Sequence, residues 1–353
     1  MPLRKIAFVV EDFITGAPSQ QLLDRFLLGY ARDGEFRRVP ELHVTVWTAP
    51  PPENSSTSFE AATSLAVRAR DLKLIQAPTL ETALDGADAV VVVAHAERVC
   101  VNEELLKNLL QRAASGTVCF VHGCLATTLT AARRLTALAQ EREIVLTAGT
   151  SVATTFRLPD VDLALDTPLA EALIVVQGPR PLAELWGIDG LSPILARRAG
   201  GESGLRSERR LDGPGVWRAA DKGEWSWALL AAALSRSNTA QGDPVSDGRT
   251  QDLVGLGRVR KLAREPRGWL LDHRDGLRSA VLVLDGVVAD FNFAVRTRTG
   301  TVLSAQLYRP PPPNRAEFDR LAAVIEDFAM TRNAPWPAER ALVVADFLSQ
   351  VPV

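Results

Sequence analysis

The chain has 353 residues, of which 46% are hydrophobic and 23% are charged, and its formal net charge is -2 at pH 7. This composition is typical of a folded globular protein, and the length favours two domains. The small net charge gives no reason to expect nucleic acid or an acidic membrane surface as a partner, and no segment reaches the ~20 apolar residues that span a bilayer. The apolar run near the start is too short for a signal peptide, so we expect a cytoplasmic protein.

The first 150 residues alternate between apolar runs and segments of helical periodicity. This alternation predicts a parallel sheet with helices on both faces, and continuous apolar runs such as 87–94 favour strands buried on both sides. Asn102 is a suitable N-cap for a helix that continues to about Arg112. Strands are expected at 6–10, 42–47, 72–76, 87–94, 118–121 and 144–147, with helices from Ser19 and at 59–70, 80–84, 102–112 and 127–140.

The pattern changes after Gly149. A strand at 172–177 and helices at 182–198 and 225–235 come first, then strands at 269–273, 279–284, 291–296 and 303–308, and then a helix at 316–330. Asp-Gly and Thr-Gly turns separate the four later strands, which predicts an antiparallel meander. We therefore expect an α/β protein with a Rossmann-like domain at 1–150. An α+β domain at 151–353 would carry an open mixed or antiparallel sheet whose free face can meet a second subunit.

The chain has three cysteines, which is too few for a disulfide framework and an odd number. Cys119 lies inside an apolar run and is interpreted as a small core residue. Cys124 follows His122 and Gly123 at a predicted strand end, where a reactive thiol is conceivable. Because zinc needs three or four ligands at recognisable spacing, this triplet predicts no metal site.

Polar residues follow the predicted parallel strands, at the edge where ligands bind in open α/β sheets. His95 follows the buried run 87–94 and His122 follows the next strand. Neighbouring strands lie ~4.8 Å apart, so the two imidazoles could face one crevice as proton carriers; the alternative is that His95 and Glu97 face solvent. The candidate ligand-binding residues at these strand ends are Glu11, Asp12, Thr48, Glu97, Cys124, Thr150 and Ser151.

Two further candidates lie in the second half of the chain. Arg157 could hold an anionic ligand through its guanidinium group, or form an ion pair with Asp160 or Asp162. Asp189, flanked by Gly187 and Gly190, could serve as an acid or base, or could lie in a surface turn.

Several segments, taken together, resemble a largely uncharacterised bacterial branch of the glucose–fructose oxidoreductase/inositol dehydrogenase/MocA family. They are Asp24–Tyr30, Thr147–Val152, Phe156–Pro159, Gly200–Gly204, Gly215–Ala220 and Asp290–Ala294, and they span most of the chain. The resemblance implies a Rossmann domain followed by an open mixed sheet. It also implies NAD(P) as a cofactor, with hydride transfer to or from a sugar-like alcohol.

The motifs that carry this chemistry are degenerate here. The first strand leads into residues 11–19 with a single glycine, whereas pyrophosphate needs the bare backbone of Gly-x-Gly-x-x-Gly. Glu11 and Asp12 bring negative charge to that place, and Thr48 offers no carboxylate for a ribose. In the resemblance, the family's catalytic lysine falls near Gly123 and its histidine near Asp189.

The sequence therefore predicts a divergent oxidoreductase-family protein that binds a small polar, sugar-like ligand. Two alternatives stay open. One is a non-catalytic subunit, either a homo-oligomer or the partner of an active homologue, assembled through strands 269–308. The other is a working NAD(P)-dependent oxidoreductase with an altered nucleotide loop.

Overall fold

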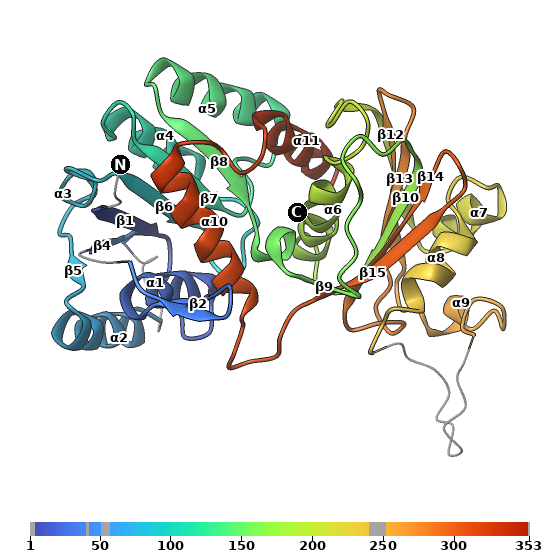
Figure 1. The fold of residues 1–353 in the computed structure, drawn as a ribbon, viewed down its shortest axis with the longest axis horizontal. Helices are drawn as coiled ribbons and strands as arrows, with labels where there is room; N and C mark the ends of the chain where they lie inside the picture. Colours follow the sequence, from blue (N-terminus) through green and yellow to red (C-terminus); the bar gives the residue numbers. More distant parts are fainter. Residues whose placement is uncertain (1–3, 40–41, 51–56, 240–251, 352–353) are drawn as a thin grey trace. The chain divides into compact units, whose positions relative to one another are not determined.

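The computed structural model describes residues 4–39, 42–50, 57–239 and 252–351. It divides into two compact units, Met1–Thr154 with Pro310–Ser349, and Thr155–Arg309 with Gln350–Val353. Figure 1 shows the elements of each unit. No helix in the described parts of the chain is long and apolar enough to cross a bilayer.

The first unit is built on a six-stranded parallel sheet in the order β5-β4-β1-β6-β7-β8. All the strands expected in the first 150 residues form, which confirms the Rossmann-like prediction. Apart from the short edge strand β5, whose Ile75 is exposed, most of their apolar residues are buried on both faces, as expected for a parallel sheet. The strands are β1 (Lys5–Val10), β4 (His43–Thr48), β5 (Ile75–Gln76), β6 (Ala89–Val93), β7 (Val118–His122) and β8 (Val145–Gly149).

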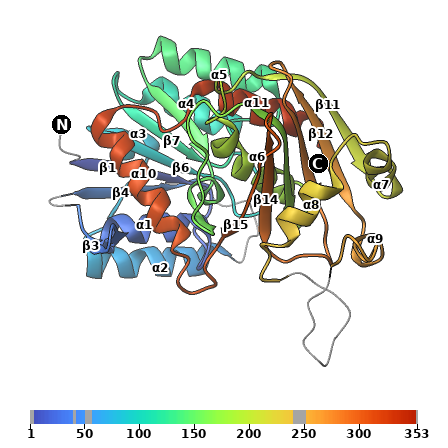
Figure 2. The same ribbon diagram turned by 45° about the vertical axis from the view of Figure 1, so that its right-hand side comes forward.

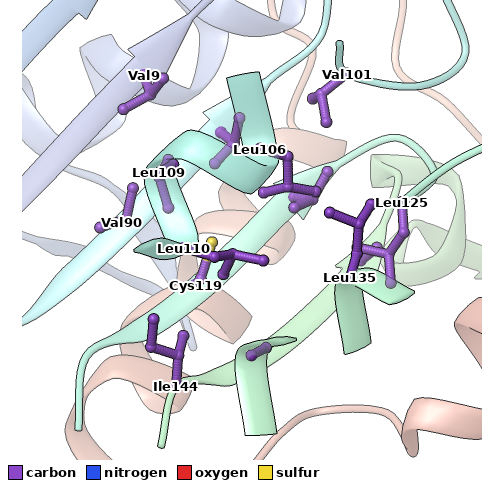
Figure 3. Close-up of a cluster of buried hydrophobic side chains, with 14 of the residues drawn as sticks. Val9, Val90, Val101, Leu106, Leu109, Leu110, Cys119, Leu125, Leu135 and Ile144 are labelled. Carbon is purple, nitrogen blue, oxygen red and sulfur yellow. The ribbon is translucent and has the colours of Figure 1, made fainter. Parts of the chain in front are cut away.

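Helices cover both faces of this sheet because alternate strand residues point to opposite sides. One face packs against α1 (Pro18–Leu28), α2 (Thr57–Leu72) and α10 (Glu317–Thr331). The other packs against α3 (Leu80–Leu84), α4 (Glu103–Arg112), α5 (Leu129–Glu141) and α11 (Ala338–Ser349). Figure 3 shows part of this second core, where Leu106, Leu109 and Leu110 of α4 lie over β6 and β7.

A short hairpin that the sequence analysis did not predict follows α1. Its strands are β2 (Tyr30–Arg32) and β3 (Glu35–Arg37), and Arg32 forms an ion pair with Asp327 of α10 at 2.8 Å. Helix α10 lies beside α1 (Figure 2), where Arg25 pairs with Asp319 at 2.6 Å. The second domain predicted at 151–353 includes this helix. In the structure its apolar stripe joins the core of the first unit, because that stripe is what it must bury.

The second unit contains a seven-stranded mixed sheet in the order β11-β12-β13-β10-β14-β15-β9. Its edge strands do not pair with each other, so the sheet is open, as predicted. The predicted meander is wrong in one respect: β10 lies between β13 and β14 and runs parallel to β13. Strand β10 is the most apolar of the set, and a central position buries it. The strands are β9 (Phe156–Leu158), β10 (Leu169–Val176), β11 (Leu205–Asp212), β12 (Arg267–His273), β13 (Arg278–Val283), β14 (Phe291–Thr297) and β15 (Val302–Tyr308).

Helices lie on both faces of the mixed sheet, as Figure 1 shows. Helix α6 (Leu182–Leu195) packs on β10 and β13, where Gly187 permits the approach: a Cβ there would lie 2.4 Å from Val281 Cγ1. The opposite face packs against α7 (Pro214–Asp221) and α8 (Trp227–Leu234), and short segments α9 (Val259–Leu262) and η1 (Ser151–Thr154) complete the fold. Helices of the chain therefore pack on both faces of this sheet, and its role as a subunit interface stays a prediction.

Candidate functional site

The carboxyl edge of the parallel sheet gathers the polar residues that the sequence singled out. The strand register pairs Val10 with both Thr48 and Val93, Val93 with His122, and His122 with Gly149. Adjacent parallel strands lie ~4.8 Å apart, so the residues that follow these positions share one edge. This edge is the first unit's candidate functional site.

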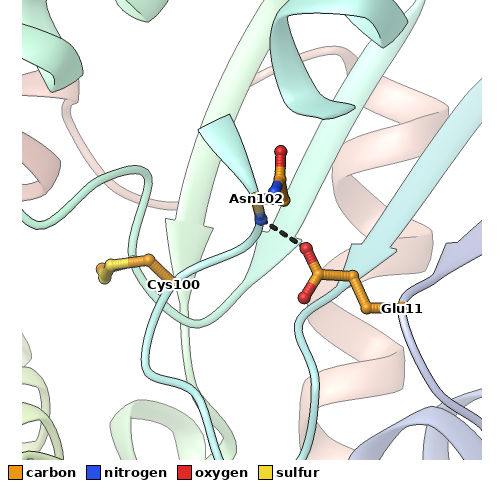
Figure 4. Close-up of a disulfide and its surroundings, with 4 residues drawn as sticks. Glu11, Cys100 and Asn102 are labelled. Atoms are coloured by element: carbon orange, nitrogen blue, oxygen red, sulfur yellow. Dashed lines mark hydrogen bonds between the residues drawn. A yellow bond between two sulfur atoms is a disulfide. The ribbon is translucent and has the colours of Figure 1, made fainter. Parts of the chain in front are cut away.

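Two carboxylates at this edge hold the loop that follows β6. Glu11 accepts hydrogen bonds from the backbone N–H of His95 at 3.1 Å and of Asn102, while Asp12 accepts from the N–H of Ala96 at 2.9 Å. Figure 4 shows the Glu11–Asn102 contact. The side chains of Glu11 and Asp12 are only 5% and 10% exposed. Both carboxylates therefore anchor the loop after β6 to this edge of the sheet.

A disulfide between Cys100 and Cys124 ties the same loop to the segment after β7 (Figure 4). The backbone N–H of Cys124 also bonds Val99 O at 2.9 Å, and Gly123 has a φ of +120° with its Cβ position 2.5 Å from that oxygen. Only glycine tolerates this combination. The interpretation of Cys124 as a free thiol is wrong for this structure, whereas Cys119 is buried in the core as expected. The available signal was positional: both bonded cysteines follow neighbouring strands.

His95 lies beside Asp12 at this edge, as Arg98 lies beside Glu11 at 3.7 Å. His95 Nε2 lies 3.6 Å from Asp12 Oδ2, and its Nδ1 accepts the backbone N–H of Glu97 at 3.2 Å. Burial raises the pKa of Asp12; the Ala96 N–H and the His95 charge oppose this rise, and the charges of Glu11 and Glu97 add to it. The sequence analysis paired His95 with His122 and named Glu97 as its neighbouring carboxylate; the structure places the Asp12 carboxylate beside the His95 imidazole.

His122 points to the face of the sheet that α10 covers. Its ring lies 6.0 Å from that of Phe318, and its Nε2 is sealed from solvent with no hydrogen-bond partner among the described residues. Burial, followed by the positive charge of Arg315, lowers the pKa of His122 to about 4. At neutral pH this imidazole is uncharged and one nitrogen is unsatisfied. Its joint action with His95 stays a prediction.

The other predicted residues have local roles. Thr48 is half-buried at the end of β4, and Thr150 and Ser151 are buried, with Thr150 Oγ1 accepting the N–H of Val152 at 3.3 Å. In the second unit, Arg157 forms an ion pair with Asp162, one of the two alternatives, and Asp189 is buried inside α6 rather than in a surface turn. Whether these two act with the residues of the first unit stays a prediction.

The turn between β1 and α1 offers few free backbone donors. Helix α1 begins with Pro18, which has no N–H to offer a phosphate, and the preceding Gly16 N–H is taken by the Gln20 side chain. Glu11 and Asp12 are already committed to backbone donors of the neighbouring loop. Within the described residues no cluster of three or more His, Cys, Asp or Glu side chains could hold a metal ion.

The fold of the chain is that of the Gfo/Idh/MocA oxidoreductases, although no family model and no curated protein matches the sequence. Similar solved structures include myo-inositol dehydrogenase from Lactobacillus casei in complex with NAD(H) and myo-inositol, with a TM-score of 0.56 and 16% identity over 98% of this chain and 91% of that one. A Gfo/Idh/MocA family oxidoreductase from Vibrio cholerae matches with a TM-score of 0.53 and 12% identity, over 98% and 96%. Biliverdin reductase from Synechocystis, in complex with biliverdin and NADP+, matches with a TM-score of 0.52 and 12% identity, over 99% of this chain and 98% of that one. At such identities the likeness shows the fold alone.

Proposed function

We propose that this protein is a divergent relative of the Gfo/Idh/MocA oxidoreductases that binds a small polar, sugar-like ligand at the carboxyl edge of its parallel sheet, without nicotinamide chemistry. The observation that carries the proposal is the pair Glu11 and Asp12. Their carboxylates occupy the strand end that a pyrophosphate would need, and they are held there by three backbone N–H groups.

The size of the electrostatic effect supports the exclusion of NAD(P). A carboxylate about 4 Å from a phosphate oxygen repels it by about 4 kcal/mol at an effective dielectric constant of about 20. That energy corresponds to a loss of roughly a thousandfold in affinity. A neutral polyol does not suffer this repulsion, and carboxylates accept hydrogen bonds from hydroxyl groups.

His122 is the residue that suits a polar ligand best. Because its pKa is about 4, it is a poor proton carrier near neutral pH, where catalysis favours a matched pKa. A neutral imidazole with an unsatisfied Nε2 can accept or donate one hydrogen bond. The role proposed for it is ligand recognition, which requires the packing of Phe318 over its ring to open, because Nε2 is sealed from solvent in the structure. The myo-inositol in the Lactobacillus casei complex makes polyols the first ligands to test.

Calorimetric titration with NAD+, NADH, NADP+ and NADPH tests the exclusion. We expect no sub-micromolar affinity for any of them; such an affinity would instead establish the working oxidoreductase with an altered nucleotide loop. The double variant Glu11→Gln with Asp12→Asn keeps the hydrogen-bond acceptors and removes the charge. If repulsion is the cause, nucleotide binding by this variant is tighter than that of the natural chain.

Thermal-shift measurements with polyols and sugars test the ligand. We expect at least one compound to raise the Tm, because a ligand that binds only the folded state stabilises it. His122→Asn should weaken the shift, whereas His43→Asn, at the opposite edge of the sheet and exposed, should not. Absence of any shift across the panel favours the non-catalytic subunit instead.

A further inference from the structure

The second unit has an open cavity of about 510 Å³ at one end of its mixed sheet, and none of the candidate residues above lines it. It lies where β10 begins, between the turn that joins β12 to β13 and the turn that joins β14 to β15. Its lining includes Glu171, Gly276, Arg278, Arg296, Arg298 and Gly300.

Two of the arginines share one carboxylate. The register places Arg278 on one side of Glu171 and Arg296 on the other. Glu171 accepts from Arg278 through Oε1 and from Arg296 through Oε2, the latter at 2.6 Å. A single carboxylate can offset only one of the two positive charges.

The third guanidinium is not offset by a carboxylate among the described residues. Arg298 donates to the backbone oxygen of Asp275 at 3.3 Å. The Asp275 carboxylate is itself occupied by Arg198 Nε at 2.6 Å and by the N–H of Leu277 at 3.2 Å. The cavity lining thus carries three positive charges and one negative charge. Asp272 on β12 pairs with Arg278 on β13, but the Asp272 carboxylate accepts a hydrogen bond from Ser207 and does not line the cavity.

The guanidinium groups are both held in place and accessible. Ser226 Oγ, at the N-cap of α8, accepts from Arg296 at 3.1 Å, which fixes that side chain on the cavity wall. The side chains of Arg278 and Arg296 remain 52% and 31% exposed. A concave surface with an excess of one charge sign focuses its field on ligands of the opposite sign, and the guanidinium fork matches oxyanions in geometry.

We propose that this cavity binds a small molecule through a doubly charged oxyanion group, either a phosphoryl group or a dicarboxylate. The three arginines supply the charge and the donors, and the remaining volume takes the body of the ligand. This site is independent of the polar-ligand site in the first unit, so either proposal can fail without the other.

The test is calorimetric titration of the full chain with inorganic phosphate and with malonate, at low ionic strength and again with added NaCl. We expect at least one of them to bind and salt to weaken the binding. The anion that binds more tightly identifies the phosphoryl or the dicarboxylate source. Arg298→Ala should weaken binding by about tenfold, since it removes one charged donor. The control is Arg209→Ala. Arg209 lies on β11 and pairs with Glu224 outside the cavity, so this variant also removes one positive charge but should leave anion binding unchanged.

Glu171→Gln separates a ligand site from a ladder of ion pairs that serves stability alone. If the cavity binds anions, removing the competing carboxylate frees Arg278 and Arg296, and phosphate or malonate should bind more tightly. Failure of both anions to bind would overturn the proposal. It would also be overturned by unchanged affinity in Arg298→Ala, or by a Glu171→Gln variant that loses stability and gains no affinity.

Discussion

Two buried carboxylates, one in each compact unit, hold a loop in place with different partners. In the first unit, Asp12 accepts a backbone N–H from the loop after β6, and the imidazole of His95 lies 3.6 Å away. In the second, Glu202 accepts from Arg198 at 3.3 Å and from the N–H of Gly204 at 2.9 Å. The first arrangement relies on neutral donors and the second on a full positive charge.

The pKa values of the two carboxylates move in opposite directions. Burial raises the pKa of Asp12, and its partners do not overcome that cost. Burial would also raise the pKa of Glu202, but the hydrogen bond with His273 and the charge of Arg198 lower it to about 2. The comparison teaches that a guanidinium charge together with a hydrogen-bonded imidazole outweighs the cost of burying Glu202, whereas one backbone N–H and a more distant imidazole do not outweigh it for Asp12.

The largest expected loss of stability is in the second unit. Arg198 is 2% exposed and binds Glu202, Asp275 and the backbone oxygen of Leu195. Arg198→Met leaves a buried carboxylate without its partner, which costs roughly 3–5 kcal/mol of unfolding free energy. Arg209→Ala, which breaks an exposed pair, should cost less than about 1 kcal/mol. Hydrogen exchange with mass spectrometry should show loss of protection in the second unit; similar stability of the two variants would contradict the comparison.

The next largest expected loss of stability is in the first unit. The disulfide joins residues 24 apart in sequence, so removing it with Cys100→Ala and Cys124→Ala should cost about 3 kcal/mol, because the unfolded chain gains freedom. Urea unfolding with and without a reductant measures this. The reductant should destabilise the natural chain and leave the double variant unchanged. Equal sensitivity of both proteins would mean that the bond contributes nothing.

Acid should weaken the first unit before the second. The folded pKa of His122, about 4, lies below the unfolded value of about 6.5, so its contribution to stability is lost as pH falls from about 6.5 to 4. Between pH 7 and pH 5 this loss is about 2 kcal/mol. Glu202, lowered to about 2, loses its contribution only below about pH 4.5. Urea unfolding at a series of pH values measures this. His122→Asn should abolish the loss of stability between about pH 6.5 and 4, and His43→Asn should keep it.

The parallel sheet could be predicted because its signals are local. Runs such as 87–94 are apolar throughout, and Asn102 caps α4 as expected, accepting the N–H of Leu105 at 3.0 Å. The hairpin at 30–37 and strand β11 were missed because their residues are mostly polar or charged. The place of β10 between β13 and β14 was also missed, since strand order depends on contacts between distant segments.

The positions of the candidate residues could be predicted, but their contacts could not. Glu11, Asp12, His95 and His122 lie at or just after strand ends on one edge, because parallel strands place their carboxyl ends together. Which acid meets which loop N–H depends on the path of residues 95–102, and no local pattern encodes that path. The Cys100–Cys124 bond escaped for the same reason, since an odd number of cysteines conceals a pair.

The smallest effect should come from Asp12→Asn, and its sign distinguishes the two carboxylates most sharply. Because the folded pKa of Asp12 is raised, the protonated form is favoured in the folded state, and the associated stability is lost as pH rises through that pKa. At pH 7 the ionised side chain therefore carries a cost that asparagine removes while keeping an acceptor for the Ala96 N–H. We expect a change of less than about 1 kcal/mol, towards higher stability. Glu202→Gln should do the opposite at pH 7, because it discards an ionised form that Arg198 and His273 stabilise. Both variants can be compared by urea unfolding at pH 7 and at pH 4. A Glu202→Gln variant as stable as the natural chain, or an Asp12→Asn variant destabilised by several kcal/mol, would show that backbone donors hold a buried acid as firmly as a guanidinium does.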